Sequence, residues 1–488
     1  MTSIPCNAID VDSTLPASVE PRNVIRAFLV LGFFALCSLW SFAIDHRYIY
    51  FSAYLWFGFT YGMSLQYGRF CMASAIRDLF AVGVPRMAVG IMIAVVLFSL
   101  VSAYVTVAGK STFHASPIGL YSVIGGLIFG IGMIYTGGCA SGSLYKTGEG
   151  SMAALLVVLS LSFTQALFVD AGGWLNHLVP AAWTESALSK GLPAAVTPTD
   201  GWYDQFLAGY VWNLSATTVG ELLGFKNPVA AAFLGNSLIN TVIPATVILA
   251  AIYLRWYRKT YLRDLKGGYR GLATELAGYW SMITASKRTA IAGLILGLAA
   301  GLQMWVMQGL QQRLGISNAG ELLAAMGHTS GLSIQDTVFD PGYFYITTQE
   351  AQGAAWVMQK LGFNAMDSIF FGLDNGIPNP LFNPVLWMSV ALIGGASVMA
   401  LLNNEFQFKL PKLEIASWAI FGGILMGIGA RIGLGCNIGA FFATVTNGDP
   451  SGWLFCLGMT IGGLIGVKFF NWWIERKMNK EMSALEDF

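Results

Sequence analysis

Ten apolar runs, each about as long as a lipid bilayer is thick, divide this chain of 488 residues. A helix needs roughly 20 apolar residues to cross a hydrocarbon core of about 30 Å. Charged residues make up only 11% of the chain, whereas soluble domains average about 25%, so a water-facing surface of ordinary composition cannot be built. We therefore expect an all-α polytopic membrane protein with about 10 spanning helices. The runs lie at 24–44, 48–67, 87–108, 119–136, 152–169, 229–254, 289–309, 382–402, 415–433 and 453–470.

Three shorter segments, 70–82, 138–147 and 435–446, follow small or glycine-rich stretches and are too short to span a bilayer. Inside a membrane, half-helices of this length are tolerated only where protein or a polar cavity covers their free backbone groups. We interpret them as re-entrant half-helices, with a short surface helix as an equal alternative for 70–82. The first apolar run, 24–44, is too long for a cleavable signal region, so we expect it to stay as a helix.

Basic residues are concentrated in a few connections, and their distribution predicts the orientation of the chain. Residues 255–288 carry eight Lys and Arg against only Asp264 and Glu275, so this connection should be cytoplasmic; lipid binding is a compatible role. Lys409 and Lys412 also indicate a cytoplasmic connection.

The predicted divisions are a polar tail 1–22, a first membrane half 23–254 with an extracytoplasmic insertion 171–227, a basic cytoplasmic loop 255–288, a second membrane half 289–474 with an extracytoplasmic insertion 311–380, and a polar tail 475–488.

An internal repeat is the most specific signal in the chain. Residues 125–142 read GGLIFGIGMIYTGGCASG and residues 422–439 read GGILMGIGARIGLGCNIG, with eight identities in 18 positions and one cysteine in register. The loop before the first copy is predicted outside and the lysine-bearing loop before the second copy inside. The two halves should therefore be inverted repeats, an arrangement that places a transport site near the membrane midplane.

Each repeat has a cysteine where one helix should end and a short one begin. Backbone N–H groups at such a start carry partial positive charge and favour an anion. Thiols are weak donors and polarizable acceptors, so Cys139 and Cys436 suit a soft sulfur or selenium atom that must also leave again. Cys37 and Cys456, inside ordinary apolar runs, are expected to be simple buried residues.

The segment QYGRFCMASAIRDLF (66–80) places a third cysteine and several charges within or beside the membrane. Intramembrane charges are costly and usually mark function or a paired structural role. For Arg77 and Asp78, the alternative to a role in substrate binding is an ion pair at the membrane interface. For Glu149, the alternative is that it fixes the end of a helix. We assign the substrate pathway to Cys71, Cys139, Cys436, Gly138, Gly435, Arg69, Ser141 and Asn437, with Arg77, Asp78, Glu149 and Arg431 in support.

These segments resemble the YeeE/YedE family of bacterial inner-membrane proteins. The resemblance rests on RFCMASAIRDLF (69–80), GGLIFGIGMIYTGGCASGSLYKTGEG (125–150) and GGILMGIGARIGLGCNIGAFF (422–442), with the following SGW (451–453). It implies two inverted repeats with re-entrant helices, thiosulfate uptake, and successive contact of the substrate with Cys71, Cys139 and Cys436. It also implies a link to a cytosolic sulfur-carrier protein, and other members are similar to proteins assigned to selenium metabolism.

The sequence therefore predicts a transporter of thiosulfate, or of a similar small sulfur-containing anion, in the cell inner membrane. The alternatives are a transporter of a selenium compound, a membrane-bound thiol sulfurtransferase with Cys436 as nucleophile, and a structural scaffold for another membrane complex. We expect no enzymatic activity and no cofactor, because the chain has no P-loop and no histidine near a motif cysteine. The six cysteines form no CxxC pair, so no metal site is expected, and no basic face suits a nucleic acid.

Overall fold

The protein is built from helices. The structure, a computed structural model, describes residues 19–169, 217–315, 346–363 and 379–486, apart from positions 112, 114, 117, 266–268 and 270, together with three isolated positions between 180 and 190. Most of the predicted insertions 171–227 and 311–380 and of the tail 1–22 lie outside the described residues. Within the described part, every regular element is helical, and the one bridge between extended residues joins Ser151 to Lys409.

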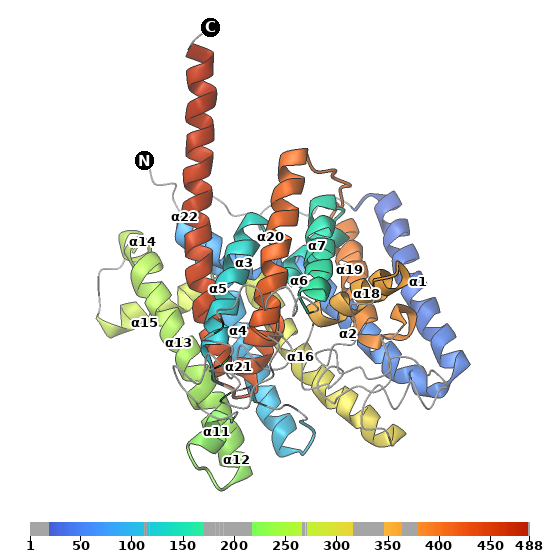
Figure 1. The fold of residues 1–488 in the computed structure, drawn as a ribbon. Helices are drawn as coiled ribbons and strands as arrows, with labels where there is room; N and C mark the ends of the chain where they lie inside the picture. The colour runs from blue at the N-terminus through green and yellow to red at the C-terminus, as the bar shows by residue number, and fades with distance from the viewer. Residues whose placement is uncertain are drawn as a thin grey trace.

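The first half alternates long helices with short ones (Figure 1). Its chain breaks twice at a cysteine, between α2 and α3 and between α5 and α6. The elements are α1 (Pro21–Ile44), η1 (His46–Tyr48), α2 (Ile49–Gly68), α3 (Met72–Arg77), η2 (Asp78–Val82), α4 (Arg86–Val107), α5 (Leu120–Tyr135), α6 (Ala140–Gly148), α7 (Met152–Val169), α11 (Val219–Leu222), α12 (Pro228–Ala230), η3 (Ala231–Val242), α13 (Ile243–Ile252), η4 (Tyr253–Tyr257) and α14 (Arg258–Arg263).

The second half follows a short helix in the basic connection. Its last helix, α22, extends well past the other helices at the C-terminal end of the molecule (Figure 1). The elements are α15 (Leu272–Thr284), α16 (Lys287–Leu314), α18 (Thr347–Lys360), η6 (Pro380–Phe382), α19 (Pro384–Leu402), α20 (Leu413–Ile432), η7 (Asn437–Ala443), α21 (Thr444–Thr446) and α22 (Ser451–Glu486).

The prediction of an all-α polytopic membrane protein is confirmed. Among the described residues, eight helices are long and apolar enough to cross a membrane, and Met152–Phe168 and Asn437–Thr446 are shorter apolar helices. All ten predicted runs coincide with helices, including the 20-residue α2. The three short segments are also helical: α3 with η2, α6, and η7 with α21.

Helix packing repeats between the halves. Helix α5 packs on α22 as α20 packs on α7, and α2 packs on α19 as α16 packs on α4. The short helix α3 contacts α22 and α4, and α18 contacts α7 and α19 in the same way. These contacts are preserved when α2 is exchanged with α16, α3 with α18, α4 with α19, α5 with α20 and α7 with α22, as expected for two repeats.

The two half-helices that follow the repeat cysteines end at opposite sides of the molecule. Ser151, just after α6, lies beside Lys409, just before α20. Asp449, just after α21, accepts a hydrogen bond from the Ser116 N–H, just before α5, at 2.7 Å. Helices α5 and α20 run in opposite directions, because Gly125 lies against Gly433 whereas Gly132 lies against Gly422, and the repeats are therefore inverted.

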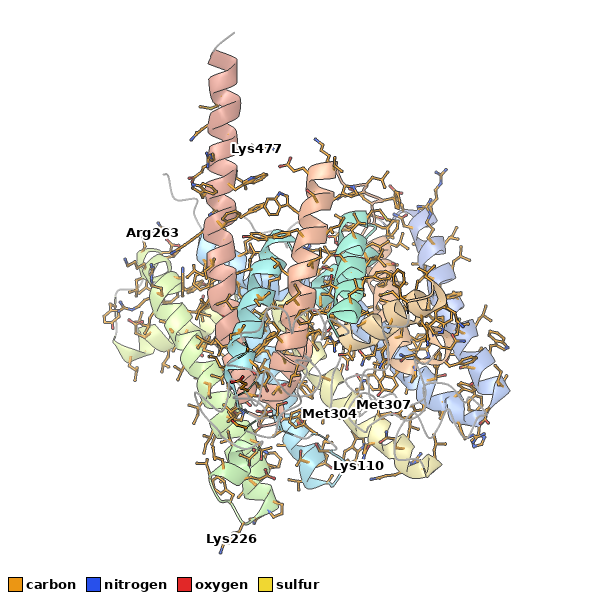
Figure 2. The ribbon with its side chains drawn as sticks, in the orientation of Figure 1. Lys110, Lys226, Arg263, Met304, Met307 and Lys477 are labelled. Carbon is orange, nitrogen blue, oxygen red and sulfur yellow. The ribbon has the colours of Figure 1, made fainter. Side chains whose placement is uncertain are left out.

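Basic residues mark the two ends of the molecule (Figure 2). Arg263 of α14 and Lys477 of α22 lie at one end, and Lys110 and Lys226 lie at the other. This places the basic end of α14 on the same side as the basic end of α22. The arrangement is the one that a shared cytoplasmic side requires.

Glycines allow the helices of the repeats to approach closely. A Cβ on Gly126 or Gly130 of α5 would collide with the backbone carbonyls of Phe455 and Met459 in α22. The approach is mutual, because Gly458 of α22 lies against the backbone of α5. Glycines at a spacing of four therefore permit this close helix contact, and no larger residue fits these positions without moving a helix.

Candidate functional site

The three motif cysteines each begin a short helix inside the protein. Cys71 precedes α3, Cys139 precedes α6 and Cys436 precedes η7, and all three side chains are buried. Cys139 and Cys436 have nearly the same backbone angles, with φ −79° and ψ −178° for the first and φ −84° and ψ −175° for the second. The repeat in the sequence is therefore also a repeat in local geometry.

A left-handed residue turns the chain just before each repeat cysteine. Gly137 has φ 67° and Leu434, at the equivalent position, has φ 56°. Gly435, between Leu434 and Cys436, has φ 156° and leaves no room for a side chain, because a Cβ would lie 2.9 Å from the Ala440 nitrogen. A Cβ on Gly138 would lie 3.2 Å from the Ser143 hydroxyl. These turns point the first backbone N–H groups of each half-helix back toward its cysteine.

Cys71 and Cys139 form a thiol pair. Their sulfur atoms are 3.8 Å apart, and the Ser141 hydroxyl lies 3.5 Å from the Cys139 sulfur. Gly142 of α6 supplies the space, since a Cβ there would lie 2.6 Å from the Cys71 sulfur and 3.3 Å from the Cys139 sulfur. Two soft, polarizable groups therefore meet from different helices at one point.

Cys436 has a different set of neighbours. Its sulfur accepts a hydrogen bond from the Ile438 N–H at 3.4 Å. The Thr347 side chain of α18 interacts with the thiol, and the Glu350 carboxyl lies close enough to act on it electrostatically. Because α18 is the counterpart of α3, a hydroxyl group in the second half has the place that the Cys71 thiol has in the first.

A central cavity of about 50 Å³ joins the two halves. Ser141, two residues after Cys139, and Asn437, directly after Cys436, both line it. The Asn437 side-chain oxygen is buried and has no hydrogen-bond partner within the described part of the chain. The other lining residues are mostly apolar: Tyr61, Leu65, Phe70, Met72, Ile91, Ala94, Leu296, Ala300, Ile346, Leu392, Ile438 and Phe442.

Arg69 lies in a polar cluster at the end of α2. Its guanidinium donates to the Glu405 carboxylate at 2.7 Å, and Gln66 donates to the other oxygen of Glu405 at 2.7 Å. Gln66 also lies 3.4 Å from the carboxylate of Glu149, at the end of α6. Burial raises the pKa of the Glu149 carboxyl above its ordinary value, and the positive charge of Lys146 opposes this.

Arg431 is buried in α20 and holds two other elements. Its guanidinium donates twice to the Gln165 side-chain oxygen, at 2.8 and 3.2 Å. Gln165 of α7 in turn donates to the Thr347 carbonyl oxygen at 3.2 Å. Arg431 therefore fixes the start of α18, beside Cys436, through one intermediate side chain.

Of the predicted site residues, Ser141 and Asn437 line the cavity, and the motif cysteines and the charged residues are not among its lining residues. Arg77 and Asp78 form an ion pair with each other at 2.9 Å, and the Arg77 side chain is half-exposed. Cys37 and Cys456 are partly buried among apolar neighbours, as expected. Among the described residues, no group of three or more His, Cys, Asp or Glu side chains could hold a metal ion.

Sequence reasoning missed Thr347, Glu350 and Gln165. The first two lie in the polar run TTQEAQ (347–352), whose residues are all buried. The symmetry of the repeats could have indicated these residues. An inverted repeat requires a counterpart of the helix after Cys71 in the second half, and this counterpart is α18.

Known proteins resemble this chain over most of its length. A family model described as sulphur transport matches residues 67–465, which include all three motif cysteines. The thiosulfate transporter TsuA of Spirochaeta thermophila is 27% identical over 421 residues, covering 83% of this chain and 94% of that protein. The thiosulfate transporter TsuA of Escherichia coli is 25% identical over 407 residues, covering 83% and 90%. A probable transporter of Escherichia coli, YedE, is 30% identical over 130 residues, covering 26% and 32%.

Proposed function

Because this chain belongs to the sulphur transport family, we propose that it carries thiosulfate across the bacterial inner membrane through the cysteine-lined interior. The observation that carries the proposal is the meeting of two inverted, cysteine-started half-helices at one cavity. Two relatives that align with most of the chain are named thiosulfate transporters. Both are transporters by name, which favours transport over the sulfurtransferase and scaffold alternatives.

Thiosulfate has a terminal sulfur atom and three oxygen atoms, and it carries two negative charges. Neutral thiols at Cys71, Cys139 and Cys436 offer weak S–H donors to the soft terminal sulfur. The N–H groups at the starts of α6 and η7 favour the negative charge, and Ser141 and Asn437 add polar contacts for the oxygens. Each contact is weak, so the anion is held without being trapped.

The charged residues act at the mouth and in the frame of this route. Arg69, within its polar cluster with Glu405 and Glu149, lies where the half-helix α6 ends. We assign it a contact with the anion at that mouth, which lies on the side of Lys477 and is therefore the cytoplasmic exit. Arg431 fixes the start of α18 through Gln165. Arg77 and Asp78 are assigned a supporting role outside the route.

The basic end of the molecule is assigned to the cytoplasm, so that thiosulfate enters the cell at the end that carries Arg263 and Lys477. Transfer there to a cytosolic sulfur-carrier protein is part of the proposal, on the strength of the family resemblance. A selenium compound remains the alternative cargo, because the pathway recognises a soft atom rather than one element.

Uptake of labelled thiosulfate into proteoliposomes tests the proposal. Cys71→Ala, Cys139→Ala and Cys436→Ala should each lose uptake, and the control changes Cys37→Ala and Cys456→Ala should retain it. Unlabelled selenite and sulfate are added as competitors, and neither should match unlabelled thiosulfate. If uptake survives all three motif substitutions, the cysteines are not part of the pathway. If selenite competes more strongly than unlabelled thiosulfate, the cargo is a selenium compound.

A further inference from the structure

Glu350 is a carboxyl group in the interior of a membrane protein. It lies in the first turn of α18, with 7% of the residue exposed. Its Oε1 atom has no hydrogen-bond partner within the described part of the chain, and the polar group that faces the carboxyl is the neutral Ser389 hydroxyl of α19. A polar group left in this way is costly to bury, and a negative charge is far more costly.

No cation compensates this carboxyl among the described residues. The elements with the most extensive contacts to α18 are α7, α19 and η6, and their sequences contain no Asp, Glu, Lys, Arg, His, Tyr or Cys. The titratable group that faces Glu350 from another element is the Cys436 thiol. On α18 itself the other ionisable residue is Lys360, ten residues away, beside the Trp356 ring. Arg431 reaches the helix through Gln165, and this contact ends on the Thr347 carbonyl oxygen.

The carboxyl is nonetheless next to the proposed route. Cys436 is close enough for the charge of Glu350 to act on its thiol. Thr347, one turn before Glu350, contacts the same thiol, and Ile346 lines the central cavity. An ionised Glu350 would place a negative charge about one helical turn behind Ile346 in the cavity wall, where it would repel a doubly charged anion, whereas a protonated Glu350 would not.

We propose that Glu350 is a proton-binding site of the transport route, and that thiosulfate passes Cys436 only while this carboxyl is protonated. The proposal rests on the proposed function. The bound proton removes the repulsion between carboxylate and anion, and burial without a cation favours the protonated form. Loss of the proton to water blocks the second half of the route. The rate of transport therefore depends on pH through one residue.

The test is the initial rate of thiosulfate uptake into proteoliposomes from pH 5.5 to pH 8.5, with the membrane potential held constant. In the wild-type protein the rate should fall as pH rises, approaching about tenfold per pH unit above the midpoint, because one proton is lost. Glu350→Gln, a neutral substitute of the same shape, should transport at every pH and lose this dependence. Glu414→Gln, which alters an exposed carboxyl paired with Lys477, is the matched control and should keep the wild-type profile.

Three outcomes would overturn the proposal: a wild-type rate independent of pH, a Glu350→Gln profile equal to that of the wild type, and a wild-type rate that depends on sodium instead of protons when choline replaces sodium. Absence of uptake by the wild-type protein at every pH would instead contradict the proposed function.

Infrared spectroscopy detects the protonated carboxyl directly, without a transport assay. The carbonyl band of a protonated carboxyl should be present at neutral pH in the wild type and weaker in Glu350→Gln, and equal bands would contradict the proposal.

Discussion

At the scale of single residues, the site depends on small side chains as much as on cysteines. Cys71 and Cys139 can approach to 3.8 Å only because Gly142 leaves space between them. Cys436 has a hydroxyl neighbour, Thr347, in place of a second thiol. The two halves therefore share a frame and differ in the groups that they present, so equivalent substitutions in the two halves should have different effects.

Gly142→Ala tests the space between the thiols. The new Cβ would lie 2.6 Å from the Cys71 sulfur, so one thiol has to move, and we expect thiosulfate uptake to fall at least tenfold. Uptake into proteoliposomes is the measurement, with size-exclusion chromatography as the check on folding. Gly32→Ala in α1 is the control, because nothing lies within 4 Å of a Cβ there. Equal uptake by both variants would show that the close thiol pair is not needed.

Thr347→Val tests the hydroxyl beside Cys436. The change keeps the shape and removes one hydrogen-bonding group, which is worth about 1 kcal/mol, or roughly fivefold in uptake. Thr347→Ser keeps the hydroxyl and should transport like the wild type. Thr284→Val removes an exposed hydroxyl that bonds within α15 and should have no effect. Normal uptake by Thr347→Val would show that this hydroxyl contributes only to packing.

At the scale of elements, the sequence was sufficient wherever apolar length alone decides the structure. The ten long runs and the three half-helices were predictable because lipid requires every backbone group to be bonded within its own segment. Helix α18 was not predicted as part of the site, because its buried first turn is polar (Thr347 to Gln352) and apolar patterns do not detect it. The π-helical turns of η2, η3 and η7 were also not predicted, since they depend on tertiary packing rather than on composition.

An ion pair attaches α15 to α14 in the basic connection. Arg258 donates to Glu275 at 2.6 and 2.9 Å, Tyr253 donates at 2.9 Å, and the hydrogen bonds from Arg258 lower the pKa of Glu275 to about 2. Because this pKa lies below its ordinary value, the pair stabilises the connection above about pH 4.5 and loses its effect as pH falls toward 2. Glu275→Gln should therefore increase amide hydrogen exchange of residues 272–284 at neutral pH.

The matched control for this change lies in the same connection. Asp264→Asn alters a carboxyl that is 44% exposed and pairs with the adjacent Arg263, so exchange in α15 should not change. Equal exchange in Glu275→Gln and the wild type would show that apolar packing, rather than the ion pair, holds α15.

At the scale of the whole molecule, inversion is what brings chemically different groups to one cavity. The first half presents Ser141, beside the Cys71–Cys139 thiol pair, and the second half presents Asn437, directly after Cys436, and Ile346, directly before Thr347. The repeat in the sequence predicted two related halves, because the cysteine and the flanking glycines recur in register, and the lysines before the second copy predicted their inversion. The repeat was not sufficient to predict the difference between the halves, because Thr347 and Glu350 lie outside the repeated segments.

Inversion also fixes which ends of the molecule face water on each side of the membrane, and this can be measured directly. Lys226 and Lys477 lie at opposite ends (Figure 2), and both side chains are exposed. In intact cells, Lys226→Cys should react with a maleimide that does not cross membranes. Lys477→Cys should react only after the cells are opened, because basic termini of helices remain in the cytoplasm. The unsubstituted protein is the control for the native cysteines. Labelling of both variants from the same side would contradict the inverted topology, and labelling in the reverse order would place the Arg69 cluster at the outer mouth of the route.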